Sequence, residues 1–196
     1  MDSKAALQKE SVTSEHQPFE RLVLTGFMGS GKTTVGRILA ARLGWRFIDL
    51  DEVIEQQDGR KVADIFAESG EAAFRRLETA ALDASLRENR VVVALGGGAL
   101  EKLANRDLLA SSLHTITVLL SAPFDVLYER CVRQNAAAIA SGAAVRPLLG
   151  DPDSAASRLA RRETTYRAVA GLVIDSSGQT PQETAEALQK ALACGV

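Results

Sequence analysis

Residues Gly26–Thr33 read GFMGSGKT and match the pattern G-x-x-x-x-G-K-[ST] of a phosphate-binding P-loop. The motif lies between a β-prone run, Arg21–Thr25, and a helical pattern over Lys32–Leu43, which is the context that it requires. Its glycines allow successive backbone N–H groups to point at a polyphosphate, helped by the N-terminus of the following helix. The motif therefore predicts a nucleotide-binding α/β domain.

Within the loop, Lys32 is expected to reach the β- and γ-phosphates of ATP, and the Thr33 hydroxyl to bind Mg²⁺. In the alternative interpretation, Thr33 or Thr34 only caps a helix after a glycine turn, and the complete motif in its correct context argues against this. The remaining ATP contacts expected in the loop and the first helical turn are Gly29, Ser30, Gly31 and Thr34.

Outside the loop, apolar runs alternate with helical patterns. Several of the apolar runs contain no polar residue, which is typical of a parallel sheet covered by helices on both faces. We find neither an internal repeat nor an interdomain linker, so residues 21–196 are expected to form one domain after a flexible tail over 1–20. Further strands are expected at Arg46–Ile48, Val91–Leu95, Thr115–Leu120 and Gly171–Asp175, and helical patterns at Glu52–Asn89 (broken near Gly59 and Gly70), Glu101–Ala110, Ser154–Ala170 and Pro181–Ala193.

The composition excludes several classes of protein. The chain has 196 residues, 46% hydrophobic and 24% charged, as is typical of a soluble globular domain. Its net charge of −2 provides no overall basic field for a nucleic acid. No apolar run is long enough for a membrane span, and the N-terminal segment lacks the apolar core of a secretory signal. Two cysteines, Cys131 and Cys194, fit a reducing cytoplasm, where we expect a monomer.

P-loop proteins usually supply an acid for the metal from the end of a neighbouring strand. Only Asp49 and Asp175 stand at the ends of the expected strands. Asp175 precedes SSGQT, which is typical of a surface turn, so Asp49 is the leading candidate. Asp49 could instead be the N-cap of a capping box with Glu52.

Asp51 lies two residues beyond Asp49 and needs a separate interpretation. If it lies past the strand end, its side chain can point into the crevice outside the sheet, where open α/β sheets bind ligands. It could equally be the N-cap of the helix that starts near Glu52. Spacing alone leaves both interpretations open.

Three glycines, Gly96–Gly98, follow another apolar strand and would allow a ligand to approach the backbone closely. On the helical pattern FRRLE, Arg75 could lean towards a ligand and pair with Glu78 three residues later. Arg161 and Arg162 form a second arginine cluster, although most helical arginines are simply solvated. The planar fork of an arginine is well matched to a carboxylate.

Arg146 follows a segment of small residues, Asn135–Val145, which predicts a mobile loop or a weak helix. An arginine beside such a segment suits a lid that closes over ATP and neutralises charge during phosphoryl transfer. Arg130 lies before this segment and could either flank the base or belong to a solvated helix face.

In chain order, the stretches GFMGSGKTTVGR, FIDLDEVIE, IFAESGEAAFRRLE, LGGGA, VRPLL and RRETTYRAVA resemble the shikimate kinase family, over about Arg21 to Asp175. The P-loop alone is generic, whereas the DLD pair, the FRRLE element and the triple glycine are much more specific. The resemblance implies a three-layer α/β/α P-loop fold with a five-stranded parallel sheet and a mobile lid at about residues 134–150. It also implies ATP-dependent phosphorylation of the shikimate 3-hydroxyl, which gives 3-phosphoshikimate and ADP in aromatic amino-acid biosynthesis.

The resemblance also implies roles for single residues. Lys32 and Thr33 match the phosphate and Mg²⁺ ligands, Asp49 matches the acid beside the metal, and Asp51 matches the aspartate that holds the substrate hydroxyls and serves as the base. Lys32, Asp51 and Arg146 are thereby implied to be catalytic. The shikimate contacts implied by position are Asp51, Arg75, Gly97, Gly98 and Arg162, and the further ATP contacts are the lid residue Arg146 and Arg130 near the adenine.

The segment between Arg130 and Arg146 departs from the family pattern because it is longer and richer in Ala and Gly than the short lid expected there. Two other functions compete with the one that the resemblance implies. A different small-molecule kinase, acting on gluconate or a nucleoside monophosphate, is disfavoured by the arginines and the triple glycine, which suit a compact carboxylate. A non-catalytic nucleotide-binding domain is disfavoured by four intact residues, Lys32, Thr33, Asp49 and Asp51.

Overall fold

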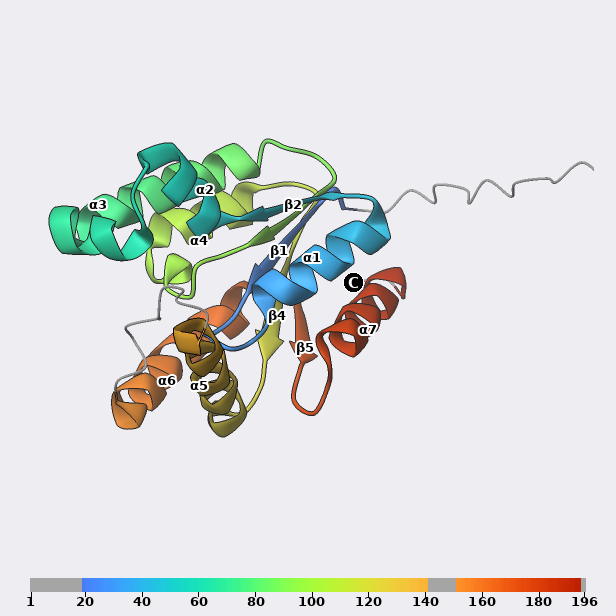
Figure 1. Cartoon of the computed structure of the whole chain (residues 1–196). Helices are drawn as coiled ribbons and strands as arrows, with labels where there is room; N and C mark the ends of the chain where they lie inside the picture. Colours follow the sequence, from blue (N-terminus) through green and yellow to red (C-terminus); the bar gives the residue numbers. More distant parts are fainter. Residues whose placement is uncertain (1–18, 141–150, 195–196) are drawn as a thin grey trace, which may run out of the picture.

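The computed structural model describes residues 19–140 and 151–194, which form a parallel sheet in the strand order β2-β3-β1-β4-β5 with helices on both faces (Figure 1). The predicted three-layer α/β/α fold with a five-stranded parallel sheet is confirmed. The strands are β1 (Arg21–Thr25), β2 (Arg46–Asp49), β3 (Val91–Ala94), β4 (Thr115–Ser121) and β5 (Leu172–Asp175). The helices are α1 (Lys32–Leu43), α2 (Leu50–Asp58), α3 (Val62–Ser85), the 3₁₀ helix η1 (Ala99–Glu101), α4 (Leu103–Ser111), α5 (Phe124–Ala140), α6 (Pro152–Val169) and α7 (Pro181–Ala193).

The side chains of the central strands alternate between two hydrophobic clusters, one on each face of the sheet. Leu22 and Leu24 of β1 pack in the cluster that α1 and α7 cover, and these two helices lie side by side (Figure 1). Val23, between them in sequence, packs in the other cluster, to which α2, α3 and α4 contribute. Burial on both faces explains why these strands contain almost no polar residue. Among the described residues, no helix is long and apolar enough to cross a membrane.

Three glycines end or interrupt helices at positions that the sequence predicts. Gly44 ends α1 in the left-handed conformation, as predicted, and Gly59 ends α2 in the same way. At Gly70 the backbone leaves helical geometry inside α3, which confirms a break at that position. The segment Asn135–Val145 is helical as far as Ala140, and its remaining residues lie outside the described ranges.

Phe19 and Glu20 are part of the fold, although the sequence analysis assigned them to the tail. Phe19 is 3% exposed and packs edge-on against Trp45, with ring centroids 5.8 Å apart. The carbonyl of Glu20 accepts from the backbone N–H of Arg90 at 2.8 Å, just before β3. These contacts attach Phe19 and Glu20 to the fold just before β1 begins.

The conformation of the P-loop depends on glycine. Gly29 has φ = 77°, in the left-handed region, and a Cβ atom at this position would collide with the carbonyl oxygen of Leu127 in α5. Backbone strain at a non-glycine residue and a collision with backbone atoms of another helix are separate costs. The loop therefore packs against α5 only because this position has no side chain.

We expect the Gly29→Ala variant to lose about 3 kcal/mol or more of unfolding free energy, because strain and a backbone collision add. Gly59→Ala is the matched control, since Gly59 also has a positive φ of 83° but has no atom within 4 Å of the added Cβ. The control should lose only about 1 kcal/mol. Urea unfolding of both variants measures the difference, and equal losses would show that the collision with Leu127 does not matter.

Candidate active site

The predicted site residues that the structure describes lie mainly at one edge of the sheet, because all five parallel strands end there. The P-loop follows β1, Asp49 is the last residue of β2, and the triple glycine begins two residues after β3 ends. The register pairs Asp49 with Ala94 of β3, so the end of β2 lies directly beside the chain that leads to Gly96.

The P-loop lysine is bound to its own loop in this structure. The Lys32 ammonium donates to the carbonyl oxygens of Gly26 at 2.8 Å and Phe27 at 3.0 Å, and it lies 3.5 Å from the hydroxyl of Ser30. Gly31, in the left-handed conformation, is the N-cap of α1. The Lys32 side chain would have to leave these carbonyls to reach a phosphate in the loop.

Asp49 makes two contacts at once. Its Oδ2 accepts from the Thr33 hydroxyl at 2.7 Å, and its Oδ1 accepts from the Asp51 N–H at 3.1 Å. Asp49 is therefore the N-cap of α2, but the predicted capping box with Glu52 is not formed. The N-cap role does not exclude a metal role, because the second oxygen of Asp49 faces the P-loop. Glu52 pairs with Arg37 at 2.5 Å.

The oxygens of Thr33 and Asp49 suit Mg²⁺, which prefers hard oxygen ligands and takes its remaining ligands from water and phosphates. Among the described residues, no cluster of three or more His, Cys, Asp or Glu side chains could hold a metal by itself. A hydroxyl and one carboxylate beside a phosphate loop fit this mode of binding. The rival acid, Asp175, accepts from the N–H of Ser177 at 2.8 Å in an exposed turn, as predicted.

Asp51 is not a helix cap. The N-cap of α2 is Asp49, and Asp51 is the second residue of the helix, so the interpretation of Asp51 as the N-cap is wrong. Its Oδ1 lies 3.0 Å from where a Cβ atom of Gly96 would be, and Oε1 of Glu78 lies 2.9 Å from the same point. Gly96 thus leaves room for two carboxyl groups from different helices, α2 and α3.

Glu78 is fully buried, and Arg75 is its ion-pair partner at 2.9 Å. This pair confirms the i, i+3 contact predicted on α3. Burial raises the pKa of Glu78 to about 7, and the negative charge of Asp51 also raises it, while Arg75 acts in the opposite direction. Glu78 is therefore a carboxyl group that titrates near neutral pH, and it lies next to Asp51.

The structure brings Arg75 and Arg162 together at the triple glycine. A Cβ atom at Gly98 would collide with the Arg75 guanidinium, and one at Gly97 would lie 3.8 Å from Nη1 of Arg162. The Arg162 side chain is 11% exposed, so a solvated helix face is wrong for this residue, whereas Arg161 is 71% exposed. The glycines at 96 and 98 provide space for protein side chains.

Two residues of this site were missed by the sequence analysis. Tyr166 is buried and donates its hydroxyl hydrogen to the carbonyl oxygen of Gly97, and burial raises its pKa to about 12. Tyr166 follows Arg162 by four residues on α6, so helical spacing was an available signal. Glu101 in η1 accepts a hydrogen bond from Arg162 at 2.7 Å, and no pattern in the sequence predicted this contact.

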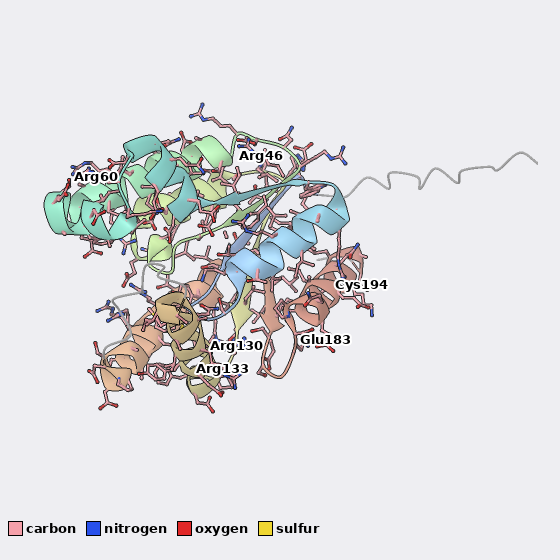
Figure 2. All side chains as sticks on the ribbon, viewed as in Figure 1. Arg46, Arg60, Arg130, Arg133, Glu183 and Cys194 are labelled. Atoms are coloured by element: carbon pink, nitrogen blue, oxygen red, sulfur yellow. The ribbon has the colours of Figure 1, made fainter. Side chains whose placement is uncertain are left out.

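The two remaining ATP candidates have different outcomes. Arg130 on α5, labelled in Figure 2, donates to the Ser176 hydroxyl at 3.1 Å and to its carbonyl at 2.6 Å. It therefore connects α5 to the turn after β5, and the solvated-face alternative is wrong. Arg146 lies outside the described residues, as does the part of the expected lid beyond Ala140. Ser30 is buried, and Thr34 is exposed on α1.

Comparisons with known proteins agree with this geometry. The family described as shikimate kinase matches residues 28–193. Shikimate kinases of Mycobacterium avium and Geobacter metallireducens are 40% and 39% identical, over 82% and 88% of this chain and 86% and 92% of theirs. The solved shikimate kinase of Acinetobacter baumannii, in complex with shikimate, has a TM-score of 0.79 at 33% identity and covers 92% of this chain and 97% of its own. A gluconokinase from Sinorhizobium meliloti, at 21% identity and TM-score 0.61, shares the fold.

Glu78 should make the protein less stable as the pH rises. Its folded pKa of about 7 exceeds the ordinary value of 4.5, so the folded state holds the proton more tightly than the unfolded state. The stabilisation is fully present below about pH 4.5 and is lost as the pH rises through about 7, which amounts to about 3 kcal/mol.

The measurement is the free energy of unfolding in urea at about pH 5 and about pH 8, for the wild type and Glu78→Gln. The wild type should lose about 2–3 kcal/mol more than the variant between these pH values. Glu71→Gln removes the exposed partner of Arg75. This variant should show the same change in unfolding free energy between the two pH values as the wild type. Identical slopes for the wild type and Glu78→Gln would contradict the assignment.

Proposed function

The chain belongs to the shikimate kinase family, and from this premise we propose which residues carry out each part of the reaction. The enzyme is an ATP-dependent kinase that transfers the γ-phosphoryl group of ATP to the 3-hydroxyl of shikimate. The hydroxyl oxygen forms a bond to the γ-phosphorus, the bond from that phosphorus to the β,γ-bridging oxygen breaks, and ADP leaves. The proton of the hydroxyl needs an acceptor at this point.

On the nucleotide side, the P-loop holds the phosphates through its backbone N–H groups and Lys32. The loop contacts are Gly29, Ser30, Gly31, Lys32, Thr33 and Thr34. Lys32 exchanges the carbonyl oxygens of Gly26 and Phe27 for phosphate oxygens, which suits a flexible ammonium with three donors. Because phosphoryl transfer has a loose transition state, this positive charge contributes mainly by positioning and charge neutralisation.

Thr33 and Asp49 are the proposed Mg²⁺ ligands. The ion, when bound, neutralises charge on the phosphate oxygens. The Thr33 hydroxyl donates to Asp49 at 2.7 Å, so both oxygens lie within the span of one coordination sphere. Asp49 also caps α2, and this holds the carboxylate in place.

On the acceptor side, Asp51 is the proposed base. It lies two residues from the metal-side acid, and its carboxylate meets the chain at Gly96. We propose that it orients the 3-hydroxyl and accepts its proton late in the transfer. This division of roles rests mainly on one contact, the bond from the Asp51 N–H to Asp49, because it joins the two halves of the site at a fixed spacing.

Arg75 and Arg162 are the proposed ligands of the shikimate carboxylate, with Gly97 and Gly98 contributing backbone contacts. Both guanidiniums are mostly buried and reach the triple glycine from different helices, α3 and α6. Two arginines can bind both oxygens of a carboxylate with charge-assisted hydrogen bonds. A titratable neighbour, Glu78, orients Arg75.

The proposed ATP contacts outside the loop are Arg130 and Arg146. Arg130 is held by hydrogen bonds to Ser176, at the end of the sheet where we propose that the adenine of ATP binds. The role of Arg146 as the lid arginine that neutralises charge in the transition state is a proposal from the resemblance alone, as is the lid at about 134–150.

A monomeric state, a location in the cytoplasm and the absence of a nucleic-acid partner also remain proposals. The net charge of −2 supports the last of these, since it gives no basic field. Cys131 and Cys194 are not joined in a disulfide in the described structure, which is compatible with a reducing compartment.

Asp51→Asn should lower kcat for shikimate phosphorylation by about 10²–10⁴, the contribution typical of a positioned general base, while ATP affinity changes little. A coupled assay of ADP release measures turnover, and calorimetry measures ATP binding. Glu52→Gln is the matched control, because it removes a carboxylate from the next position on α2, where the side chain pairs with Arg37. Near-normal turnover of Asp51→Asn would rule out the proposed base.

Asp49→Asn should raise the Mg²⁺ concentration needed for half-maximal activity by about tenfold, because the charged metal ligand is lost. Its unfolding free energy should stay close to that of the wild type, since Asn is as good an N-cap as Asp. Asp175→Asn is the control, as it changes the other aspartate at a strand end. A higher Mg²⁺ requirement in the Asp175 variant alone would reassign the metal acid.

A further inference from the structure

One carboxylate of the protein already lies on the arginines proposed for the substrate carboxylate. Oε2 of Glu101 accepts from Nη2 of Arg162 at 2.7 Å and lies 3.8 Å from Nη2 of Arg75. Its other oxygen, Oε1, accepts from Nη2 of Arg161 at 3.1 Å. Glu101 is thus bound by a fork of guanidiniums in the way that a carboxylate ligand would be.

Burial explains why an internal counter-ion is needed here. The side chain of Arg162 is 11% exposed, and a buried guanidinium without an anionic partner is costly, whereas Arg75 already pairs with Glu71 and Glu78. Glu101 itself is 31% exposed at the rim. Burial alone would raise the pKa of Glu101, but hydrogen bonds and charge from Arg162, and then Arg161, lower it, so the group is ionised at neutral pH.

The nitrogens of Arg75 are all engaged by carboxylates of its own helix, whereas Glu101 binds one nitrogen of Arg162. Arg75 donates from Nε and Nη2 to Glu71 and from Nη1 to Glu78. Glu101 takes Nη2 of Arg162, which leaves Nη1 as the Arg162 nitrogen that faces Gly97. Nη2 carries a second N–H, but a substrate carboxylate bound there would lie beside the carboxylate of Glu101, and the repulsion between these like charges favours displacement of Glu101.

We propose that Glu101 is a positioning residue that occupies the place of the shikimate carboxylate on Arg162 in the substrate-free enzyme and yields that place when shikimate binds. The inference rests on the proposed roles of Arg75 and Arg162. Arg161, 71% exposed, keeps hold of the other oxygen of Glu101, so the displaced carboxylate moves towards solvent without losing its partner.

This exchange weakens the binding of carboxylate ligands at the site. A simple carboxylate offers only what Glu101 already offers, so it gains little by displacing an internal group held at high effective concentration. Shikimate adds contacts from its hydroxyls, for which Asp51 is the proposed ligand. The internal carboxylate therefore lowers the affinity for every carboxylate, and only a ligand with further contacts overcomes it.

Glu101→Gln keeps the shape of the side chain and removes its charge. We expect KM and Kd for shikimate to fall about fivefold with kcat changed less than about twofold, the size of effect expected for one partly exposed ion pair. The inhibition constant of cyclohexene-1-carboxylate, which lacks the hydroxyls, should fall by at least as much. A residue that only supports Arg162 would give the opposite sign, a higher KM.

A double-mutant cycle with Arg161→Gln tests the exchange itself. Without Arg161, Glu101 should compete more strongly for Arg162, so KM for shikimate should rise about two- to threefold. In the Glu101→Gln background the same change should have no effect. The matched control is Glu88→Gln, which breaks an ion pair with Arg46 at the other end of β2 (Arg46 is labelled in Figure 2) and should leave KM unchanged.

An unchanged or raised KM in Glu101→Gln overturns the proposal, as does an Arg161 effect that persists without the Glu101 charge. If Glu101→Gln does not fold, as urea unfolding would show, Arg161→Gln alone still decides the sign. The Arg162→Ala variant separates the proposed role of Glu101 from the proposed carboxylate site on Arg75 and Arg162. If Arg162→Ala leaves KM for shikimate unaltered, the carboxylate site itself is misplaced, whereas a raised KM there with no Glu101 effect removes only the role of Glu101.

Discussion

The hydrogen bonds of Asp49 hold the two halves of the site together. One carboxylate oxygen accepts from Thr33 at the start of α1, and the other from the N–H of Asp51 at the start of α2. The helix that follows the P-loop and the helix that carries the proposed base are therefore both bonded to the Asp49 carboxylate at the end of β2. In the proposed mechanism, this capping interaction sets the spacing between nucleotide and acceptor, which in-line transfer must keep constant.

Glycines allow charged side chains to pack closely together at this edge of the sheet. At Gly96 two carboxyl groups approach the main chain, and at Gly98 a guanidinium does. Any larger residue would push these side chains apart and lower the electrostatic coupling between them. The raised pKa of Glu78 follows from this crowding, since burial removes water and Asp51 adds a second negative charge nearby.

The sequence predicted the fold and the location of the site well, because both depend on local signals. The P-loop, the apolar strands and the αL glycine at 44 are local, and the helical spacing of Arg75 and Glu78 is too. Asp51 could not be separated from a helix cap, since the choice depended on a helix start two residues away. Glu101 could not be found at all, because its partners lie about sixty residues away on α6 and only the packing of η1 against that helix brings them together.

The bond from Tyr166 to Gly97 has a consequence for how the acceptor site responds to thermal motion. Arg162 and Tyr166 are on the same face of α6, and the Tyr166 hydroxyl is attached to the glycine segment that Arg162 overlies. A shift of α6 would therefore act on the Arg162 guanidinium and on the Gly97 backbone together. Under the proposed roles, the distance between these two carboxylate contacts would then change less than the position of the helix.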